Sequence, residues 1–474
     1  MKPFRTIGVL FGLTTASFLQ AQELTKDATK LYEQFCAGCH GDKMQGGQGT
    51  SLIDDVWNRG DGSDEYLTRM ITEGLPDVGM PGFGAALDAP RVRGLVVYLR
   101  ERAVRAQEAQ TEYAKPVEGM EVKGRAANFR IETVVSGLGV PWSVAFLPGG
   151  DLLVAERAGK LRQVRGGVLE PEPIAGTPKV WAQSQGGLLV VEAHPDYARN
   201  GWIYLAFSDP GEKAGEAMTA VVRGRIRDGR WVDEQQIYRA PRELYRAAGV
   251  HFGTRLVFAE GYLFFGIGDR GAQDQAQDLK RPNGKIHRVH DDGRVPVDNP
   301  FVKTPGALPT IWSYGHRNPQ GIAARPGTSG AGFQLWETEH GPRGGDELNL
   351  VRRGANYGWP LITYGMNYNG TPITSETGRP GLEQPVLHWT PSIAASGLDV
   401  YSGDQFPGWR GNLLTGSLKQ QELRRLVMNG EQVVEQEVLF RGIGRVRSVQ
   451  VSRSGAVYVC LEEPGRVLRL VPVK

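Results

Sequence analysis

The chain has 474 residues, more than one ordinary hydrophobic core holds, so its length predicts two domains or one large repetitive domain. It is 40% hydrophobic and 23% charged, which excludes a disordered chain and a multi-span membrane protein. The 55 basic and 52 acidic residues are interspersed and leave a net charge of only +3, so no nucleic-acid partner is expected. The 64 glycines favour many tight turns, hence many short strands, over a helical bundle.

Residues 1–22 have the pattern of a secretory signal peptide. Lys2 and Arg5 precede an apolar run from Ile7 to Leu19, and no acidic residue occurs before Glu23. The run is shorter than the ~20 apolar residues that span a bilayer, and no other stretch approaches that length. We therefore expect the segment to be removed on export to the periplasm and expect no membrane span in the mature protein. A retained membrane anchor is the alternative.

A Cys-x-x-Cys-His motif at Cys36, Cys39 and His40 predicts a covalently attached c-type haem. The two thiols would bond to the porphyrin, and the adjacent histidine would ligate the iron. A redox dithiol and half of a zinc site are the alternatives, but neither requires the histidine.

Two amphipathic helices are predicted around this motif, one capped by Asp27 and one by Asp88. This arrangement resembles a class I cytochrome c domain, which we place at residues 23–105. The polar composition of residues 106–128 predicts a flexible linker after it.

The sixth iron ligand of this domain is expected to be a methionine, because His40 is its only histidine. Met80 is the candidate, since Pro81 stiffens its loop and the neighbouring glycines let the loop approach the haem. Met44 follows the attachment motif too closely to reach the other haem face, and Met70 fits a helix face.

Residues 129–474 repeat a pattern of a short apolar strand, a turn and a second apolar strand. Many strands are continuously apolar, which indicates burial on both faces. Six units begin near Trp142, Gly187, Arg255, Gly321, Gly397 and Arg447. The sequence therefore predicts a multidomain protein, a small all-α cytochrome c domain followed by an all-β six-bladed propeller. A pair of β-sandwiches is the alternative to the propeller.

The residues just before each first strand should meet around the propeller axis, because they occupy the same end of every blade. They are Gln185, His251, Arg317, Asn318, Ser396, Arg445 and Arg447. Converging cations and amides suit a flat polyanion, although solvated surface arginines are the alternative.

His251 precedes a predicted hairpin and Asp269 follows it, so the two should meet where the ends of the hairpin come together. Asp269 could then orient the imidazole and leave its other nitrogen to take up a proton. The pair predicts a catalytic base, and a structural histidine is the alternative.

A series of motifs in the propeller region resembles the soluble PQQ-dependent glucose/aldose dehydrogenase family, including its sorbosone-type members. The motifs are His251–Leu256, Tyr314–Gly321, His340–Pro342, Asp346–Asn349 and Asn356–Pro360. The resemblance spans about residues 129–472. It implies a propeller that holds PQQ and calcium on its axis and oxidises an aldose-type sugar with His251 as the base.

The resemblance also implies roles for individual residues. The residues that would contact the quinone or the substrate are Gln185, Arg317, Asn318, His340, Lys419, Arg445 and Arg447. Arg317 would also stabilise charge on the quinone oxygen. The carbonyls of Gly341 and Pro342 would ligate one Ca²⁺, and Glu347 and Tyr357 would serve a second, structural Ca²⁺.

Two positions depart from the family pattern. Val250 stands where glucose-oxidising members have an acid, and His340 replaces a polar amide, so the identity of the sugar is left open. With the cytochrome domain, the resemblance implies electron transfer from PQQ to haem and on to an external acceptor, a cytochrome or an oxidase. A non-catalytic propeller binding module and an electron-transfer protein with a docking propeller are the alternatives. Cys460, in an apolar strand, is expected to be a buried free thiol.

Overall fold

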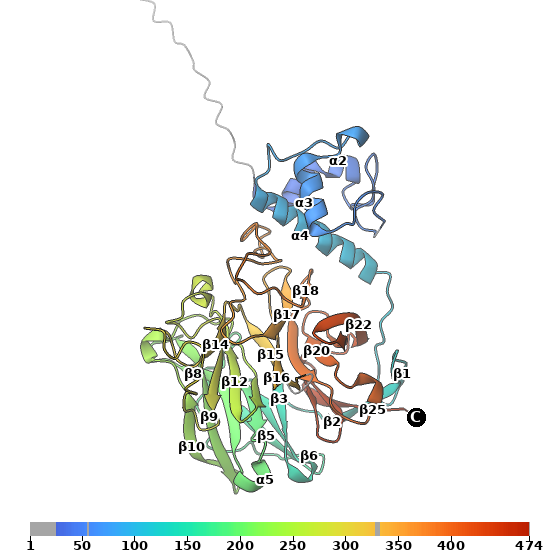
Figure 1. The fold of residues 1–474 in the computed structure, drawn as a ribbon. Coiled ribbons are helices and arrows are strands. Elements are labelled where there is room, and N and C mark those ends of the chain that lie inside the picture. Colours follow the sequence, from blue (N-terminus) through green and yellow to red (C-terminus); the bar gives the residue numbers. More distant parts are fainter. Residues whose placement is uncertain (1–24, 55, 328–331, 474) are drawn as a thin grey trace, which may run out of the picture.

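The computed structural model describes residues 25–54, 56–327 and 332–473, which form a small helical domain seated on a β-propeller (Figure 1). The predicted signal peptide lies outside the described residues. Among these residues, no helix combines the length and the apolar character that crossing a membrane requires.

The helical domain has its core where three amphipathic helices meet. Its elements are α1 (Ala28–Phe35), α2 (Ala37–His40), α3 (Asp64–Glu73), the 3₁₀-helix η1 (Pro76–Val78) and α4 (Ala89–Glu108). Asp27 and Asp88 cap α1 and α4 by accepting the backbone N–H of Thr29 and Arg91, so both predicted helix starts are confirmed. Leu31, Leu67 and Leu95 are among the buried side chains between the helices.

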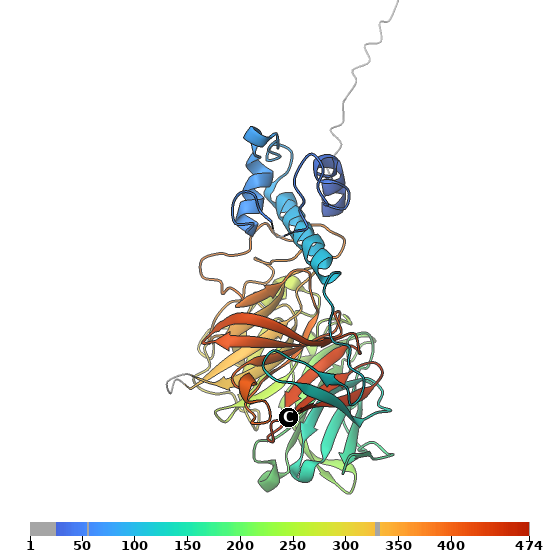
Figure 2. The same cartoon turned by 90° about the vertical axis from the view of Figure 1, so that its right-hand side faces the viewer.

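The propeller consists of six antiparallel sheets arranged as blades around an axis, as predicted (Figure 2). Blade 1 has β3 (Pro141–Phe146), β4 (Leu152–Glu156), β5 (Lys160–Arg165) and β6 (Val168–Leu169). Blade 2 has β7 (Leu188–Ala193), β8 (Ile203–Pro210), β9 (Ala217–Arg227) and β10 (Arg230–Tyr238). Blade 3 has β11 (Leu256–Ala259), β12 (Tyr262–Ile267), β13 (Lys285–His290) and β14 (Ile311–Tyr314).

The remaining blades follow the same plan, and blade 6 draws strands from both ends of the propeller sequence. Blade 4 has β15 (Pro319–Pro326), β16 (Phe333–Glu339), β17 (Asp346–Val351) and β18 (Leu387–Trp389). Blade 5 has β19 (Ala395–Val400), β20 (Leu413–Ser417), β21 (Glu422–Asn429) and β22 (Gln432–Arg441). Blade 6 has β23 (Val446–Val451), β24 (Val457–Leu461) and β25 (Arg466–Pro472), completed by β2 (Phe129–Val135) and β1 (Glu121–Val122). Short helices in the connections are η2 (Pro148–Gly150), α5 (Tyr197–Asn200), η3 (Arg242–Leu244), η4 (Gln273–Ala276) and η6 (Pro407–Trp409).

The first strand of each blade begins within two residues of the predicted unit start, and these inner strands contact one another in a closed ring. The apolar second strands are buried as their composition predicts: every residue of β4 is buried, and Cys460 in β24 is fully buried. Pairing of β2 with β25 closes the ring, since Arg130 lies opposite Val471 and Ile131 opposite Leu470.

The segment predicted as a flexible linker is partly folded onto the propeller. Helix α4 extends to Glu108, whose carboxylate pairs with Arg441 at 3.0 Å. The Arg441 guanidinium also lies 3.8 Å from the ring centroid of Tyr113, and β1 adds to the edge of blade 6. The connection between the two domains therefore follows the propeller surface.

Candidate active site

The candidate site lies at one end of the propeller axis. His251 precedes β11, Asp269 follows β12 and Arg317 follows β14, and these positions share one end of blade 3. Arg317 donates to the His340 carbonyl at 2.8 Å, and the Gln320 side chain bonds both Asn318 and Arg447, at 3.1 and 3.0 Å. Asn318 in turn accepts the N–H of Gly253, two residues after His251, at 3.3 Å. The residues that precede the first strands of the blades are predicted to converge, and the structure brings these members of the set together.

His251 and Asp269 are in direct contact, with His251 Nδ1 2.6 Å from Asp269 Oδ1. Asp269 is fully buried, and its other carboxylate oxygen accepts the indole N–H of Trp359 at 2.8 Å. Because the carboxylate binds at Nδ1, the hydrogen is assigned to Nδ1 and the lone pair to Nε2. This arrangement can take up a proton from a hydroxyl group placed at Nε2.

Both members of the pair have shifted pKa values. Burial lowers the pKa of His251, and the charge of Arg317 acts in the same direction, against the opposing influence of Asp269. Burial alone would raise the pKa of Asp269, but its contact with His251 and the charge of Arg317 outweigh burial and lower it. At neutral pH the pair is therefore a neutral imidazole beside a carboxylate, which is the state that a base requires.

The backbone of His251 is held in an uncommon conformation, with φ of +53°. Its N–H donates to Gln185 Oε1 at 2.8 Å, so Gln185 fixes this loop. Arg270 is fully buried and donates to the carbonyls of Val250 and Ala248 on the same loop. Sequence reasoning missed Arg270, although its position directly after Asp269 could have drawn attention to it.

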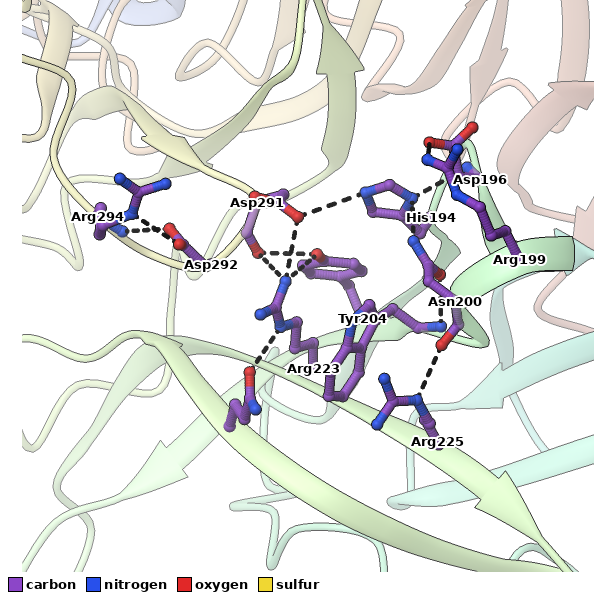
Figure 3. Close-up of polar contacts among 12 residues, drawn as sticks. His194, Asp196, Arg199, Asn200, Tyr204, Arg223, Arg225, Asp291, Asp292 and Arg294 are labelled. Atoms are coloured by element: carbon purple, nitrogen blue, oxygen red, sulfur yellow. Dashed lines mark hydrogen bonds and ion pairs between the residues drawn. The ribbon is translucent and has the colours of Figure 1, made fainter.

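A second histidine–aspartate pair lies at the opposite end of the propeller, because Asp291 follows β13, which runs antiparallel to β12 (Figure 3). His194 Nε2 is 3.6 Å from Asp291 Oδ2, while its Nδ1 contacts the side-chain amide of Asn200 at 2.9 Å. Arg223 also binds Asp291 at 3.2 Å. Both ring nitrogens of His194 are engaged, so this network fits a contact between blades 2 and 3.

Arginines supply positive charge around the His251 side chain. Arg317 is 6% exposed and donates to the carbonyl of His340 at 2.8 Å. Arg447 Nε and Arg445 Nε donate to the two carboxylate oxygens of Glu462, each at 2.6 Å. Glu462, which sequence reasoning missed, thus positions two of the predicted cations and offsets part of their charge.

Two buried polar atoms beside these arginines, Arg317 Nε and His340 Nε2, lack a hydrogen-bond partner within the described part of the chain. Asn318 is buried, and its Oδ1 accepts the Gly253 N–H at 3.3 Å. Since buried polar groups are nearly always satisfied, the two atoms without partners fit an anionic quinone ligand.

Lys419, like Gln185, is an exposed member of the predicted set. Its backbone N–H donates to the Ile393 carbonyl at 3.1 Å, and its ammonium group has no ion pair with the described residues. The structure thus fixes its backbone, while its side chain makes no hydrogen bond or ion pair with the other predicted residues among those described.

The predicted calcium-binding segment forms a tight turn before β17. Gly341 N–H donates to Asp346 Oδ1 at 2.9 Å, and the Pro342 carbonyl accepts the Ser392 hydroxyl at 2.9 Å. A Cβ atom at Gly341 would lie 2.0 Å from the Gly345 carbonyl oxygen, so the turn requires glycine. Backbone carbonyls beside the buried Asp346 carboxylate are the hard oxygen donors that Ca²⁺ prefers, and the segment fits this cation.

Glu347 is half-buried and lies beside a buried acidic cluster of Glu337, Glu339 and His316, whose ligand atoms are within 4.8 Å of one another. The side-chain amide of Asn349 donates to Glu337, Glu339 and Glu347 at 3.1, 3.3 and 3.2 Å. His316 Nδ1 lies 3.6 Å from Glu339 Oε1, and it is buried without a hydrogen-bond partner among the described residues. Burial, followed by the charge of neighbouring carboxylates, raises the pKa of Glu337 and Glu347 well above the ordinary value. Converging carboxylates of this kind fit a divalent cation, and sequence reasoning missed Glu337, Glu339 and His316.

Tyr357 lies against this cluster through its ring, which stacks on His316 with 4.5 Å between ring centroids. Its hydroxyl group donates to the Leu350 carbonyl at 2.6 Å and accepts the Arg352 N–H at 2.8 Å. The phenol oxygen is therefore occupied by backbone, and the contribution of Tyr357 to the cluster is the packing of its ring.

The haem-attachment motif occupies the start of the helical domain. Cys36 is half-buried, Cys39 is exposed, and His40 ends α2. His40 Nδ1 lies 2.8 Å from the Thr50 carbonyl oxygen, which fixes the ring and leaves Nε2 as the nitrogen for an axial bond. Two thiols and an oriented imidazole fit covalent haem.

Of the candidate methionines, Met44 is fully buried in the core of the helical domain, and Met70 packs against that core. Met80 lies in a turn whose backbone pairs Leu75 with Met80 in both directions, at 2.9 and 3.1 Å. Since the other two are used for packing, the structure favours Met80 as the thioether that can face a haem.

Comparison with known proteins identifies both domains. Residues 138–469 match the glucose/sorbosone dehydrogenase family, and residues 23–99 match the family of cbb3-type cytochrome c oxidase subunit III. Aldose sugar dehydrogenase YliI of Escherichia coli is 42% identical over 354 residues, which cover 73% of this chain and 94% of the relative.

Solved structures give the same result. The crystal structure of the apo-form of the soluble Escherichia coli aldose sugar dehydrogenase superposes with a TM-score of 0.67 at 40% identity, covering 73% of this chain and all of that one (100%). The PQQ-bound aldose sugar dehydrogenase of Streptomyces coelicolor superposes with a TM-score of 0.59 at 27% identity, covering 73% of this chain and 98% of that one. The chain belongs to the glucose/sorbosone dehydrogenase family and carries a cytochrome c domain ahead of its propeller.

Proposed function

We propose that the chain is a periplasmic quinohaemoprotein that oxidises an aldose-type sugar, or a related hydroxy or aldehyde compound, with PQQ and passes the electrons to its covalent haem c. The observation that carries the proposal is the 2.6 Å contact between His251 Nδ1 and Asp269, surrounded by converging arginines. Family membership supports the activity class, and the PQQ-bound relative supports the cofactor.

When bound, PQQ supplies an electron-poor quinone that accepts hydride from the substrate carbon. Its three carboxylates call for a cationic pocket, and the arginines around His340 supply one. The residues that would hold PQQ or the substrate are Gln185, Arg317, Asn318, His340, Lys419, Arg445 and Arg447. Two buried polar atoms without partners among the described residues, on Arg317 and His340, support this assignment.

His251 acts as the base: its Nε2 takes up the proton of the substrate hydroxyl as hydride leaves the adjacent carbon. Asp269 holds the ring and stabilises the imidazolium that forms. Arg317 would supply positive charge to a quinone oxygen that becomes negative as the quinone ring takes up hydride.

Two calcium sites complete the proposal. The carbonyls of Gly341 and Pro342 would hold the ion beside the quinone, where its charge would supplement that of Arg317. Glu347 would serve a second, structural ion within the buried acidic cluster, with the ring of Tyr357 packed beside it.

In the helical domain, Cys36 and Cys39 would bind the haem covalently, and His40 and Met80 would be its axial ligands. An external acceptor, a cytochrome or an oxidase, would then take the electrons from the haem. The presence of both a base site and a haem motif in one chain favours this proposal over a non-catalytic binding module.

The test is to reconstitute the purified full-length protein with PQQ and Ca²⁺ and to follow haem absorbance while a panel of aldoses, sorbosone and polyols is added. We expect haem reduction by at least one sugar, at a rate independent of protein concentration, and none before PQQ is added. Failure of every sugar to reduce the haem of the reconstituted protein would overturn the proposal. Reduction by a protein donor alone would point to an electron-transfer protein.

A further inference from the structure

Buried contacts join the cytochrome domain to blade 4, and we call this contact region the seat. Glu101 of α4 accepts both Nε and Nη2 of Arg343, at 3.0 and 2.8 Å, and the Glu101 side chain is only 2% exposed. Arg93 of the same helix donates to the Tyr364 carbonyl at 3.0 Å. These partners lie just before β17 and in the long loop 352–386 between β17 and β18, beneath α4 in Figure 1.

Apolar contacts reinforce this seat. Ala28 and Val97 of the cytochrome domain form a buried cluster with Met366 of the loop, and all three are fully buried. The Ala28 N–H also donates to the Gly370 carbonyl at 3.2 Å. Because a carboxylate as deeply buried as Glu101 is costly unless it is paired, the docked arrangement depends on the Glu101–Arg343 pair.

Each part of the seat is close in the chain to a part of the candidate active site. Arg343 directly follows Gly341 and Pro342, the predicted calcium-binding residues. Met366 is in the same loop as Trp359, whose indole binds Asp269.

The two segments are also joined to each other. Arg343 and Met366 exchange backbone hydrogen bonds in both directions, each at 2.9 Å. The cytochrome domain therefore contacts a single bridged unit, which continues on one side into the calcium turn and on the other into the Trp359 loop.

We propose that Arg343 is a positioning residue through which Glu101 of the cytochrome domain orders the calcium turn and the Trp359 loop. The cytochrome domain thus serves the quinone site as a clamp, in addition to any role as an electron acceptor. This inference rests on the proposed function for the identity of the ligands, PQQ and Ca²⁺.

The physical basis is preorganisation. A turn that is already held by the cytochrome domain loses less conformational freedom when it binds Ca²⁺ than a turn that is free to move. Weakening the seat should therefore weaken ion and quinone binding without altering any group that touches either ligand.

The first experiment compares hydrogen exchange in the full-length haem-containing protein, without PQQ, for wild type and Glu101→Gln. The variant keeps the size of the side chain and removes its charge. We expect faster exchange in residues 341–346 and 357–370, with unchanged haem absorbance. Glu437→Gln is the matched control, because Glu437 is also buried and accepts Nε and Nη2 of one arginine, Arg425, within blade 5 and outside the bridged Arg343–Met366 unit.

The second experiment measures the Ca²⁺ concentration at which half of the protein binds PQQ. In Glu101→Gln this concentration should rise roughly fivefold or more, the size of a typical coupling between two sites, and stay unchanged in Glu437→Gln. Met366→Ala keeps every charge of the seat and should also speed hydrogen exchange and raise the Ca²⁺ midpoint. It replaces Glu101→Gln if that variant does not fold.

Unchanged exchange and an unchanged Ca²⁺ midpoint in the folded variants would overturn the clamp. If wild type binds no PQQ, the proposed function fails. Hydrogen exchange then still decides whether the seat orders the two segments, because it needs neither ligand.

Discussion

Trp359 donates its indole N–H to Asp269 Oδ2 at 2.8 Å, on the carboxylate oxygen that His251 does not contact. The carboxylate is thus held from two sides, by a histidine at the entry to blade 3 and by a tryptophan from the loop of blade 4. The Arg317 guanidinium lies 5.4 Å from the centroid of the same indole ring. One aromatic side chain therefore contacts both the His251–Asp269 pair and Arg317.

Trp359→Phe tests this relationship, because it removes the N–H and keeps most of the packing. Turnover with an artificial electron acceptor should fall about tenfold, since a hydrogen bond to a charged group is worth about 1.5–3 kcal/mol. The KM for sugar and the affinity for PQQ should change little. An unchanged kcat would show that Trp359 only packs against Asp269.

Replacing the base itself should have the largest effect. His251→Gln should reduce turnover by ~10²–10⁴ while PQQ still binds, the usual contribution of a positioned base. Asp269→Asn should cost less, because it removes the orienting charge and keeps the base. His194→Gln, in the network of Figure 3 at the other end of the propeller, is the control and should remain near wild type.

The dependence of kcat/KM on pH should report the state of His251. The base needs its lone pair, so activity is lost as the pH falls through the His251 pKa. Burial and the Arg317 charge lower that pKa, so the loss should be centred below the ordinary histidine value of about 6.5. An acid limb centred above pH 7 in the reconstituted enzyme would contradict the assignment.

Met80→Ala should keep the haem, because Cys36 and Cys39 remain, but lower its reduction potential through loss of the thioether ligand. Redox titration and the Met–iron absorption band measure this change. Met70→Ala is the control, since Met70 packs against the domain core. An unchanged potential in Met80→Ala would reject Met80 as the ligand.

Calcium should stabilise the propeller through the buried acidic cluster. Three glutamates share one asparagine amide there, and a bound cation would relieve their mutual repulsion. Adding Ca²⁺ to the chelator-treated protein should raise its Tm, and Glu347→Gln should lose most of that increase. An equal increase in wild type and Glu347→Gln would place the ion elsewhere.

The sequence was informative wherever a structural relationship is local or follows from strand pairing. Asp27 and Asp88 cap their helices within a few residues of chain, and His251 and Asp269 meet because one hairpin joins them. The blade starts could be predicted for the same reason, since each depends on its own apolar run.

Two of the relationships that sequence reasoning missed join segments that are distant in the chain. Glu101 meets Arg343, and Trp359 meets Asp269, only after separate elements have packed together. No periodicity or spacing marks such a pair in advance. The polar composition of residues 106–128 likewise predicted a free chain, because composition does not reveal that Arg441 and the edge of blade 6 bind this segment.

Blade 6 has a consequence for the order in which the protein can be assembled. Strand β2 is made before any of the first five blades, yet its partner β25 ends only two residues before the C-terminus. During synthesis from the N-terminus the cytochrome domain is complete while the propeller is still an open ring with an unpaired edge. The domain that is proposed to hold the haem is thus finished well before the candidate active site is enclosed, and a chain interrupted before β25 would complete its cytochrome domain but leave the ring of blades open.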